Sequence, residues 1–122
     1  MAFQFVMPSV RSFLSVIPIQ NKGLLEVAVS EAITNAIRAS SKQSIHFSLL
    51  FDSMILKVRI MDHGQGFNVK NEVAKIAAWG KNIPEDLLLS ESGKGLWIIY
   101  QVFDYIQFNT KGNKIILIKN IN

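Results

Sequence analysis

The clearest periodic segment of the chain runs from Leu24 to Ser40. Apolar residues recur there at intervals of three and four, and neither proline nor glycine interrupts them. This spacing places the apolar side chains on one face of an α-helix, where they can pack against a core. We therefore predict an amphipathic helix over residues 24–40.

Two segments that follow this helix have the pattern of β-strands. Residues 44–51 and 54–62 are rich in isoleucine, leucine, phenylalanine and valine, and a turn at Asp52 and Ser53 separates them. In the second segment apolar residues alternate with charged ones, which is the period of two expected for a half-buried strand. The pattern predicts two strands joined by a short turn.

The N-terminal segment carries signals for both a strand and a helix. The sequence "FQFVM" at 3–7 predicts a short edge strand, and Pro8 then favours the start of a helix. This helix is expected to end before Pro18, because the residue that precedes a proline disfavours helical geometry.

The second half of the chain predicts shorter elements. A weak helical pattern covers 70–78, and Gly80 and Pro84 prevent one continuous element after it. Another helix is expected from about 94 to 103, and two strands flank a turn at 111–113. This order of helices and strands predicts an α+β fold, with one mixed sheet covered by helices on one face.

Length and composition predict a single globular domain over residues 1–122. The chain can form one hydrophobic core but is too short for two, and its low share of charged residues excludes a disordered chain. No run approaches the roughly 18 apolar residues that a membrane span needs. Arg11 interrupts the apolar N-terminal stretch, which argues against a signal peptide, so we expect a cytoplasmic protein with no membrane partner.

Cysteine and charge exclude further classes of function. The absence of cysteine excludes disulfides and thiolate metal sites, and two histidines far apart in the sequence argue against zinc. The net charge is +4, but the basic residues are scattered and are not interleaved with aromatic ones. We therefore expect no nucleic-acid partner, whereas a modest positive field suits a small polyanionic ligand.

The predicted helix over 24–40 carries two polar residues that need an explanation. Glu31 and Asn35 lie one helical turn apart on one face. A carboxylate and a carboxamide at this spacing could simply be solvated, or they could be directed together at a cation. The helix alone leaves both interpretations open.

The stretch "DHGQGF" (62–67) places an aspartate at a strand end, followed by glycines at alternate positions. Aspartate and glycine are common in turns, so an ordinary turn explains the pattern when it is taken alone. The alternative is a ligand site in which Gly64 and Gly66 let the backbone approach a flat ligand while Asp62 accepts its hydrogen bonds.

The stretch "SGKGLWII" (92–99) places two glycines and a lysine before a predicted helix. It is either an ordinary helix start or an anion site, because free amides and the helix dipole favour an anion at a helix N-terminus. A Walker A loop is excluded, since Lys94 is followed by Gly95 and not by serine or threonine. A Rossmann fingerprint is excluded because neither glycine pair has the required third glycine.

Taken together and in this order, the Glu31–Asn35 helix, "DHGQG" and "GKGL" resemble the N, G1 and G2 boxes of the GHKL ATPase superfamily. The chain is most similar to the anti-sigma-factor serine/threonine kinases of bacterial partner-switching systems in three sequence segments, "VSEAITNAIRAS", "DHGQGF" and "SGKGLWIIYQVFDYIQF". The resemblance covers about residues 8–120. It implies a two-layer α/β sandwich of the Bergerat type with a mostly antiparallel sheet.

The resemblance also implies roles for individual residues. Asn35 would bind a Mg²⁺ that bridges the ATP phosphates, Glu31 would be the catalytic base, and Asp62 would accept the adenine amino group. The segment 67–92 would be the ATP lid. Further contacts to the base and the phosphates are expected from Gly64, Gly66, Gly93, Lys94, Gly95 and Leu96. Relatives commonly hold adenine with a threonine near the last hairpin, where this chain has Asn113 and Lys114.

The implied function is a serine/threonine protein kinase that binds ATP or ADP with Mg²⁺ and phosphorylates a small antagonist-like (STAS) protein. A sigma factor and a homodimer remain open as further partners. Two alternatives are a non-catalytic, nucleotide-dependent binding regulator and the detached ATP domain of a histidine kinase. Glu31 favours the kinase, because binding alone needs no base. Trp79 and the leucines at 87–89 either pack the lid or form a partner surface.

Overall fold

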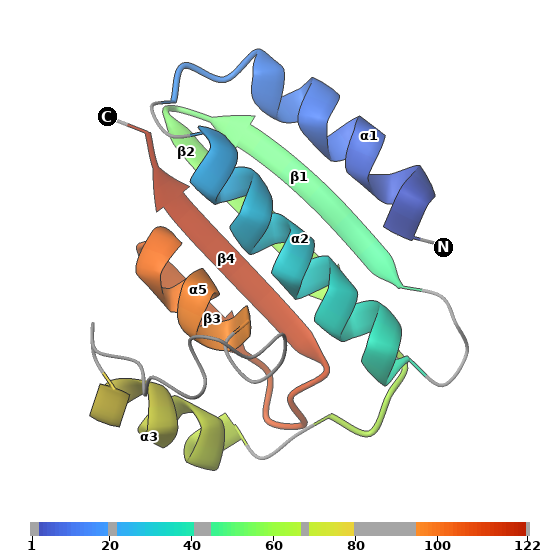
Figure 1. The fold of residues 1–122 in the computed structure, drawn as a ribbon, viewed down its shortest axis with the longest axis vertical. Coiled ribbons are helices and arrows are strands. Elements are labelled where there is room, and N and C mark those ends of the chain that lie inside the picture. Colours follow the sequence, from blue (N-terminus) through green and yellow to red (C-terminus); the bar gives the residue numbers. More distant parts are fainter. Residues whose placement is uncertain (1–2, 20–21, 41–44, 67–68, 80–94, 122) are drawn as a thin grey trace.

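Four strands form an antiparallel sheet in the order β1-β2-β4-β3 (Figure 1). The strands are β1 (His46–Asp52), β2 (Ile55–Met61), β3 (Tyr105–Phe108) and β4 (Lys114–Asn120). This computed structural model describes residues 3–19, 22–40, 45–66, 69–79 and 95–121. Every pairing in the sheet is antiparallel, so the expected α+β fold with a mostly antiparallel sheet is confirmed.

The alternation predicted for the second strand places its apolar residues on one face of the sheet. Leu56, Val58 and Ile60 of β2 are at most 2% exposed, and Leu117 of β4 lies opposite Val58 on the same face. The hairpin between β1 and β2 turns at Ser53 and Met54, which both have positive φ (52° and 61°). Met54 therefore belongs to the turn and not to the predicted strand, because a two-residue hairpin loop with positive φ at both positions matches the strand twist.

Helices cover the apolar face of this sheet (Figure 1). They are α1 (Phe3–Ser15), α2 (Lys22–Ala39) and α5 (Gly95–Val102). Helix α3 (Val69–Trp79) lies beyond the end of the sheet and packs against α5. The predicted helix over 24–40 is confirmed as α2, and its buried residues have the predicted spacing: Leu25, Ala28, Val29, Ala32, Ile33 and Ala36. Helices α3 and α5 correspond to the patterns at 70–78 and 94–103. In the described residues no helix is long and apolar enough to cross a membrane.

The prediction of an edge strand at 3–7 is wrong, because α1 begins at Phe3 and contains Pro8. Proline inside a helix removes one backbone hydrogen bond and crowds the preceding turn. Met7, Val10 and Leu14 are nonetheless at most 2% exposed, at the three- and four-residue spacing of a helix. Burial of this stripe outweighs the cost of the proline.

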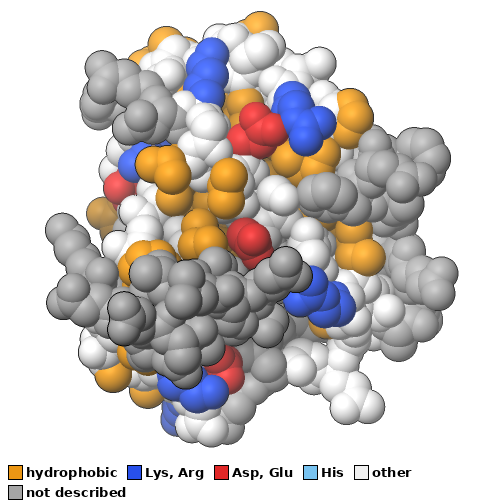
Figure 2. All heavy atoms as spheres, in the orientation of Figure 1, with side chains coloured by type: hydrophobic (Ala, Val, Ile, Leu, Met, Phe, Trp, Pro, Cys, Tyr) orange, Lys and Arg blue, Asp and Glu red, His pale blue; other side chains and the backbone are white. Residues whose placement is uncertain are grey.

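The helical face of the molecule mixes side chains of every kind (Figure 2). Lysine and arginine side chains are separated there by hydrophobic and uncharged ones among the residues that are coloured by type. One ion pair joins α1 to α2, in which Arg11 Nε donates to Glu26 Oε1 at 2.5 Å. The basic residues are therefore scattered over this face in space, as they are along the sequence.

Candidate functional site

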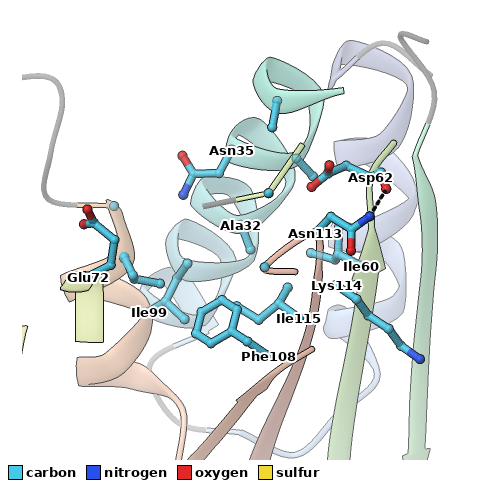
Figure 3. Close-up of a pocket in the computed structure, with 16 residues that line it drawn as sticks. Ala32, Asn35, Ile60, Asp62, Glu72, Ile99, Phe108, Asn113, Lys114 and Ile115 are labelled. Carbon is cyan, nitrogen blue, oxygen red and sulfur yellow. Dashed lines mark hydrogen bonds between the residues drawn. The ribbon is translucent and has the colours of Figure 1, made fainter. Parts of the chain in front are cut away.

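A cavity of about 320 Å³ lies between α2, α5 and the end of the sheet where β2 and β4 meet the β3–β4 turn (Figure 3). Its walls are largely apolar and include Ile60, Ile99, Phe108 and Ile115. Polar residues line it from several elements: Asn35, Asp62, Glu72, Asn113 and Lys114. An apolar cavity with a few convergent polar groups is typical of a small-molecule site.

Asp62 is the buried acid of this cavity, with 8% of its surface exposed. Its Oδ1 accepts a hydrogen bond from the Gly64 amide at 2.7 Å, and its own amide donates to the Asn113 carbonyl at 2.9 Å. None of the ion pairs found among the described residues involves Asp62. A carboxylate with one oxygen engaged keeps a second oxygen that can accept from a ligand donor.

Both glycines of the Asp62 turn are explained by contacts with protein backbone. A Cβ on Gly64 would lie 2.1 Å from the carbonyl oxygen of Ala39 at the end of α2. A Cβ on Gly66, whose φ is +79°, would lie 1.8 Å from the carbonyl oxygen of Lys111. Gly66 lines the cavity and Gly64 does not. The turn is therefore glycine-rich because it packs between α2 and the β3–β4 hairpin.

Glu31 and Asn35 both face the first residue of α5. A Cβ on Gly95 would lie 2.7 Å from Glu31 Oε2 and 3.5 Å from Asn35 Nδ2. Asn35 and Gly95 line the cavity, as does Leu96, whereas Glu31 lies beside it. The first amides of a helix have no partner within the helix and favour negative charge. The polar pair of α2 is thus directed at the N-terminus of α5.

Several expectations fall outside the described residues. Gly93 and Lys94 lie there, and so do most of the expected lid and the leucines at 87–89. The described part of the segment expected to be the lid is α3, which ends at a half-buried Trp79.

Sequence reasoning missed Glu72, which reaches the cavity from α3 while forming an ion pair with Lys75 at 3.4 Å. It also missed the aromatic wall at Phe108. Only their positions in three dimensions identify these residues, whereas Asn113 was already marked by its place in the last hairpin.

The two histidines are far apart in the sequence but are neighbours in space. The rings of His46 and His63 are 5.2 Å apart between centroids, at an interplanar angle of 72°. The pairing of β1 with β2 places His46 opposite Met61, two residues before His63. In the described residues no group of three or more histidine, cysteine, aspartate or glutamate side chains could hold a metal ion.

Comparison with known proteins gives a consistent result. Residues 7–119 match the family described as "Histidine kinase-like ATPase domain". The serine-protein kinase RsbW of Staphylococcus aureus strains MSSA476 and MW2 is 34% identical over 88 residues, which cover 66% of this chain and 54% of the relative. The chain therefore spans about half the length of these curated relatives.

Among solved structures, the histidine kinase AdeS of Acinetobacter baumannii has a similar fold. The TM-score is 0.55 at 20% sequence identity, and the match covers 98% of this chain and 62% of that chain. At this identity the likeness concerns the fold alone. It places the helices and the antiparallel sheet of Figure 1 in a known architecture.

Proposed function

The chain belongs to the histidine kinase-like ATPase domain family, and on that premise we propose that it is an ATP-binding serine/threonine protein kinase and regulatory switch of the anti-sigma-factor type. The resemblance to the GHKL superfamily that the three motifs indicated is confirmed by the family match. The kinase activity is supported by the relatives named serine-protein kinases, which are similar over part of their length.

The cavity fits an adenine nucleotide in its size and in the polar groups that line it. Its volume of about 320 Å³ lies at the lower end of the range for small-molecule sites, and Phe108 and Ile115 offer apolar walls for a purine. Asp62 provides a buried acceptor for an amino group, and the start of α5 provides amides for phosphate. The apposition of Asn35, Asp62 and the α5 N-terminus around one cavity carries this proposal.

Asn35 is the residue that would hold Mg²⁺, since the carboxamide oxygen is a hard, neutral ligand beside anionic phosphates. Bound Mg·ATP supplies the transferable phosphoryl group and neutralises part of its charge. Glu31 would accept the hydroxyl proton of the incoming serine or threonine as the new oxygen–phosphorus bond forms and ADP leaves. Its carboxylate already lies against Gly95, where the phosphates are expected.

We propose a small antagonist-like protein of the STAS type as the acceptor. It would present a serine or threonine on a loop that reaches the γ-phosphate beside Glu31. The presence of ATP or ADP in the cavity would then determine which partner protein is bound. Helix α3 would transmit this effect, because it contributes Glu72 to the cavity and packs against α5.

Substitutions of Asn35 and Glu31 on α2 test this proposal, because they should have different effects on nucleotide affinity and on phosphotransfer. Asn35→Ala should weaken both nucleotide affinity and phosphotransfer, since it removes a metal ligand. Glu31→Gln should leave ATP affinity close to wild type and lower phosphotransfer by about 10²- to 10⁴-fold, since it removes only the base. Calorimetry with Mg·ATP and transfer of labelled phosphate to a purified STAS protein measure the two quantities.

Glu26→Gln is the matched control, because Glu26 is on the same helix and pairs with Arg11. It should change neither quantity. Transfer at the wild-type rate by Glu31→Gln would remove the base role. Tight ATP binding without transfer to any bound STAS protein would favour a nucleotide-dependent binding module instead.

A further inference from the structure

An exposed stripe of α2 leads to Glu31 and Asn35. Leu24 and Val27 precede this pair at intervals of three and four residues, so the geometry of the helix places all four on one side of α2. Leu24 is 58% exposed and Val27 is 46% exposed, whereas Glu31 is half-buried. We call these four residues the α2 stripe. Its N-terminal half is an apolar surface that adjoins the proposed base.

The other sides of α2 already have partners within the protein. Its buried residues face the core, and Glu26 pairs with Arg11 of α1. Helix α5 packs against α2, and its first residue, Gly95, lies against Glu31 and Asn35. A molecule from solution therefore reaches Glu31 across the α2 stripe.

The exposure of Leu24 and Val27 is unusual for this molecule. Among the helical residues whose exposure the structure describes, they are the large hydrophobic residues that are exposed. Hydrophobic side chains reach the surface of the helical face between charged ones (Figure 2). Single exposed hydrophobic residues are common in soluble proteins, but neighbouring ones beside a functional group often mark a binding surface. Their position next to Glu31 points to a molecule on which Glu31 acts.

We infer that Leu24 and Val27 form the docking surface for the protein that accepts the phosphoryl group from ATP, and that this protein presents apolar side chains beside its acceptor serine or threonine. This inference rests on the proposed function, since it takes Glu31 as the base of a phosphotransfer reaction. It goes further, because it assigns acceptor binding to residues outside the nucleotide cavity.

The rise of an α-helix gives the spacing of these contacts. Val27 lies about 6 Å and Leu24 about 10 Å from Glu31 along the helix axis, at about 1.5 Å per residue. An extended loop spans about 3.3 Å per residue. A loop that places its hydroxyl at Glu31 and runs along the α2 stripe therefore brings residues about two and three positions away to Val27 and Leu24.

The charges near Glu31 favour an apolar acceptor segment over an acidic one. The Glu31 carboxylate and the phosphates of bound ATP are both negative, so an acidic side chain at this place is repelled. Leu24 and Val27 offer no polar group to pair with a charged side chain, whereas an apolar side chain buried against them leaves no charge unpaired. Burial of apolar surface at this contact favours association.

Leu24→Asp and Val27→Asp test the docking surface, because a charge at an exposed position should disturb binding more than folding, which thermal unfolding checks. Leu24 lies in the first turn of α2, where an acidic residue is compatible with the helix dipole. Each variant should raise the KM for a purified STAS protein by about tenfold, since it removes an apolar contact. The kcat at saturating acceptor and the affinity for Mg·ATP should stay within about twofold of wild type, because neither residue lines the nucleotide cavity.

Val16→Asp and Leu50→Asp are the matched controls. Val16 is 80% exposed and follows the end of α1, and Leu50 is 60% exposed on β1. Each control adds the same charge at an exposed hydrophobic position outside the α2 stripe, and neither should change the KM. If an aspartate variant of the stripe fails to fold, Leu24→Ala and Val27→Ala take its place and should raise the KM about threefold.

The outcomes separate this inference from the proposed function. Failure of wild type to bind Mg·ATP would refute the proposed function and, with it, the docking surface. Phosphotransfer with an unchanged KM in both stripe variants would refute the inference while the proposed function stands. A lower kcat at unchanged KM, or an equal rise of the KM in the controls, would refute it as well.

Two further results also decide. If sedimentation shows that wild type self-associates and that the stripe variants do not, at unchanged KM, the stripe binds a second copy of the chain and the inference is wrong. If wild type binds nucleotide but transfers no phosphate, calorimetry of STAS protein binding in the presence of ADP is the test. A loss of affinity of about tenfold in the stripe variants then supports docking at this surface, whereas equal affinity or no binding refutes it.

Discussion

The substitution Asp62→Asn tests base recognition with little disturbance of the fold. Asp62 Oδ1 accepts the Gly64 amide at 2.7 Å, so an asparagine at this position must keep its oxygen on that amide. Its NH₂ group then takes the place of the second carboxylate oxygen. The cavity would present a donor where it presented an acceptor, while the turn keeps its own hydrogen bond.

The expected loss of affinity follows from this exchange. A hydrogen bond to a charged acceptor contributes about 1.5–3 kcal/mol, and facing the adenine amino group with a donor adds an unsatisfied buried polar group. We expect a total of about 2–4 kcal/mol, which corresponds to roughly 30- to 700-fold in the dissociation constant of ADP. Inosine diphosphate should bind the variant better than ADP, because its carbonyl accepts from the new NH₂ group.

Calorimetry with ADP and inosine diphosphate measures both effects, and thermal unfolding checks the fold. Asp104→Asn is the matched control: the Asp104 carboxylate accepts the Asn120 amide at 2.6 Å and pairs with Lys119 at the other end of β4. It should leave nucleotide affinity unchanged. Equal ADP affinity in wild type and Asp62→Asn would remove Asp62 from base recognition and would refute this reasoning.

Two further predictions concern stability in urea unfolding. Gly66→Ala should lower the free energy of unfolding by more than about 2 kcal/mol, because its methyl group would overlap the Lys111 carbonyl at a position with positive φ. Gly23→Ala is the matched control in α2, since its methyl group would meet no atom within 4 Å. This variant should be neutral or should stabilise the protein by up to about 1 kcal/mol. Leu56→Ala, at a fully buried position, should cost about 2–5 kcal/mol, and Leu50→Ala, at a position 60% exposed, less than about 1 kcal/mol. Equal losses within either pair would contradict the packing described above.

The sequence alone determined the elements whose burial is periodic. The spacing along α2 and the alternation along β2 are local patterns, and each element buries the side predicted for it. The proximity of Glu31 and Asn35 also follows from the sequence, because helix geometry places residues four apart on one face. The three motifs, in their order, were sufficient to indicate the family, since their spacing is a property of the chain itself.

Tertiary structure decided what depends on contacts between distant segments. Pro8 lies inside a helix because the stripe of Met7, Val10 and Leu14 buries against the core, which local propensity does not encode. His46 and His63 meet because strand register brings them together. Glu72 and the contact of Asn113 with Asp62 likewise join segments far apart in the sequence. Such contacts depend on packing across the sheet and between helices, so no window of sequence periodicity contains them.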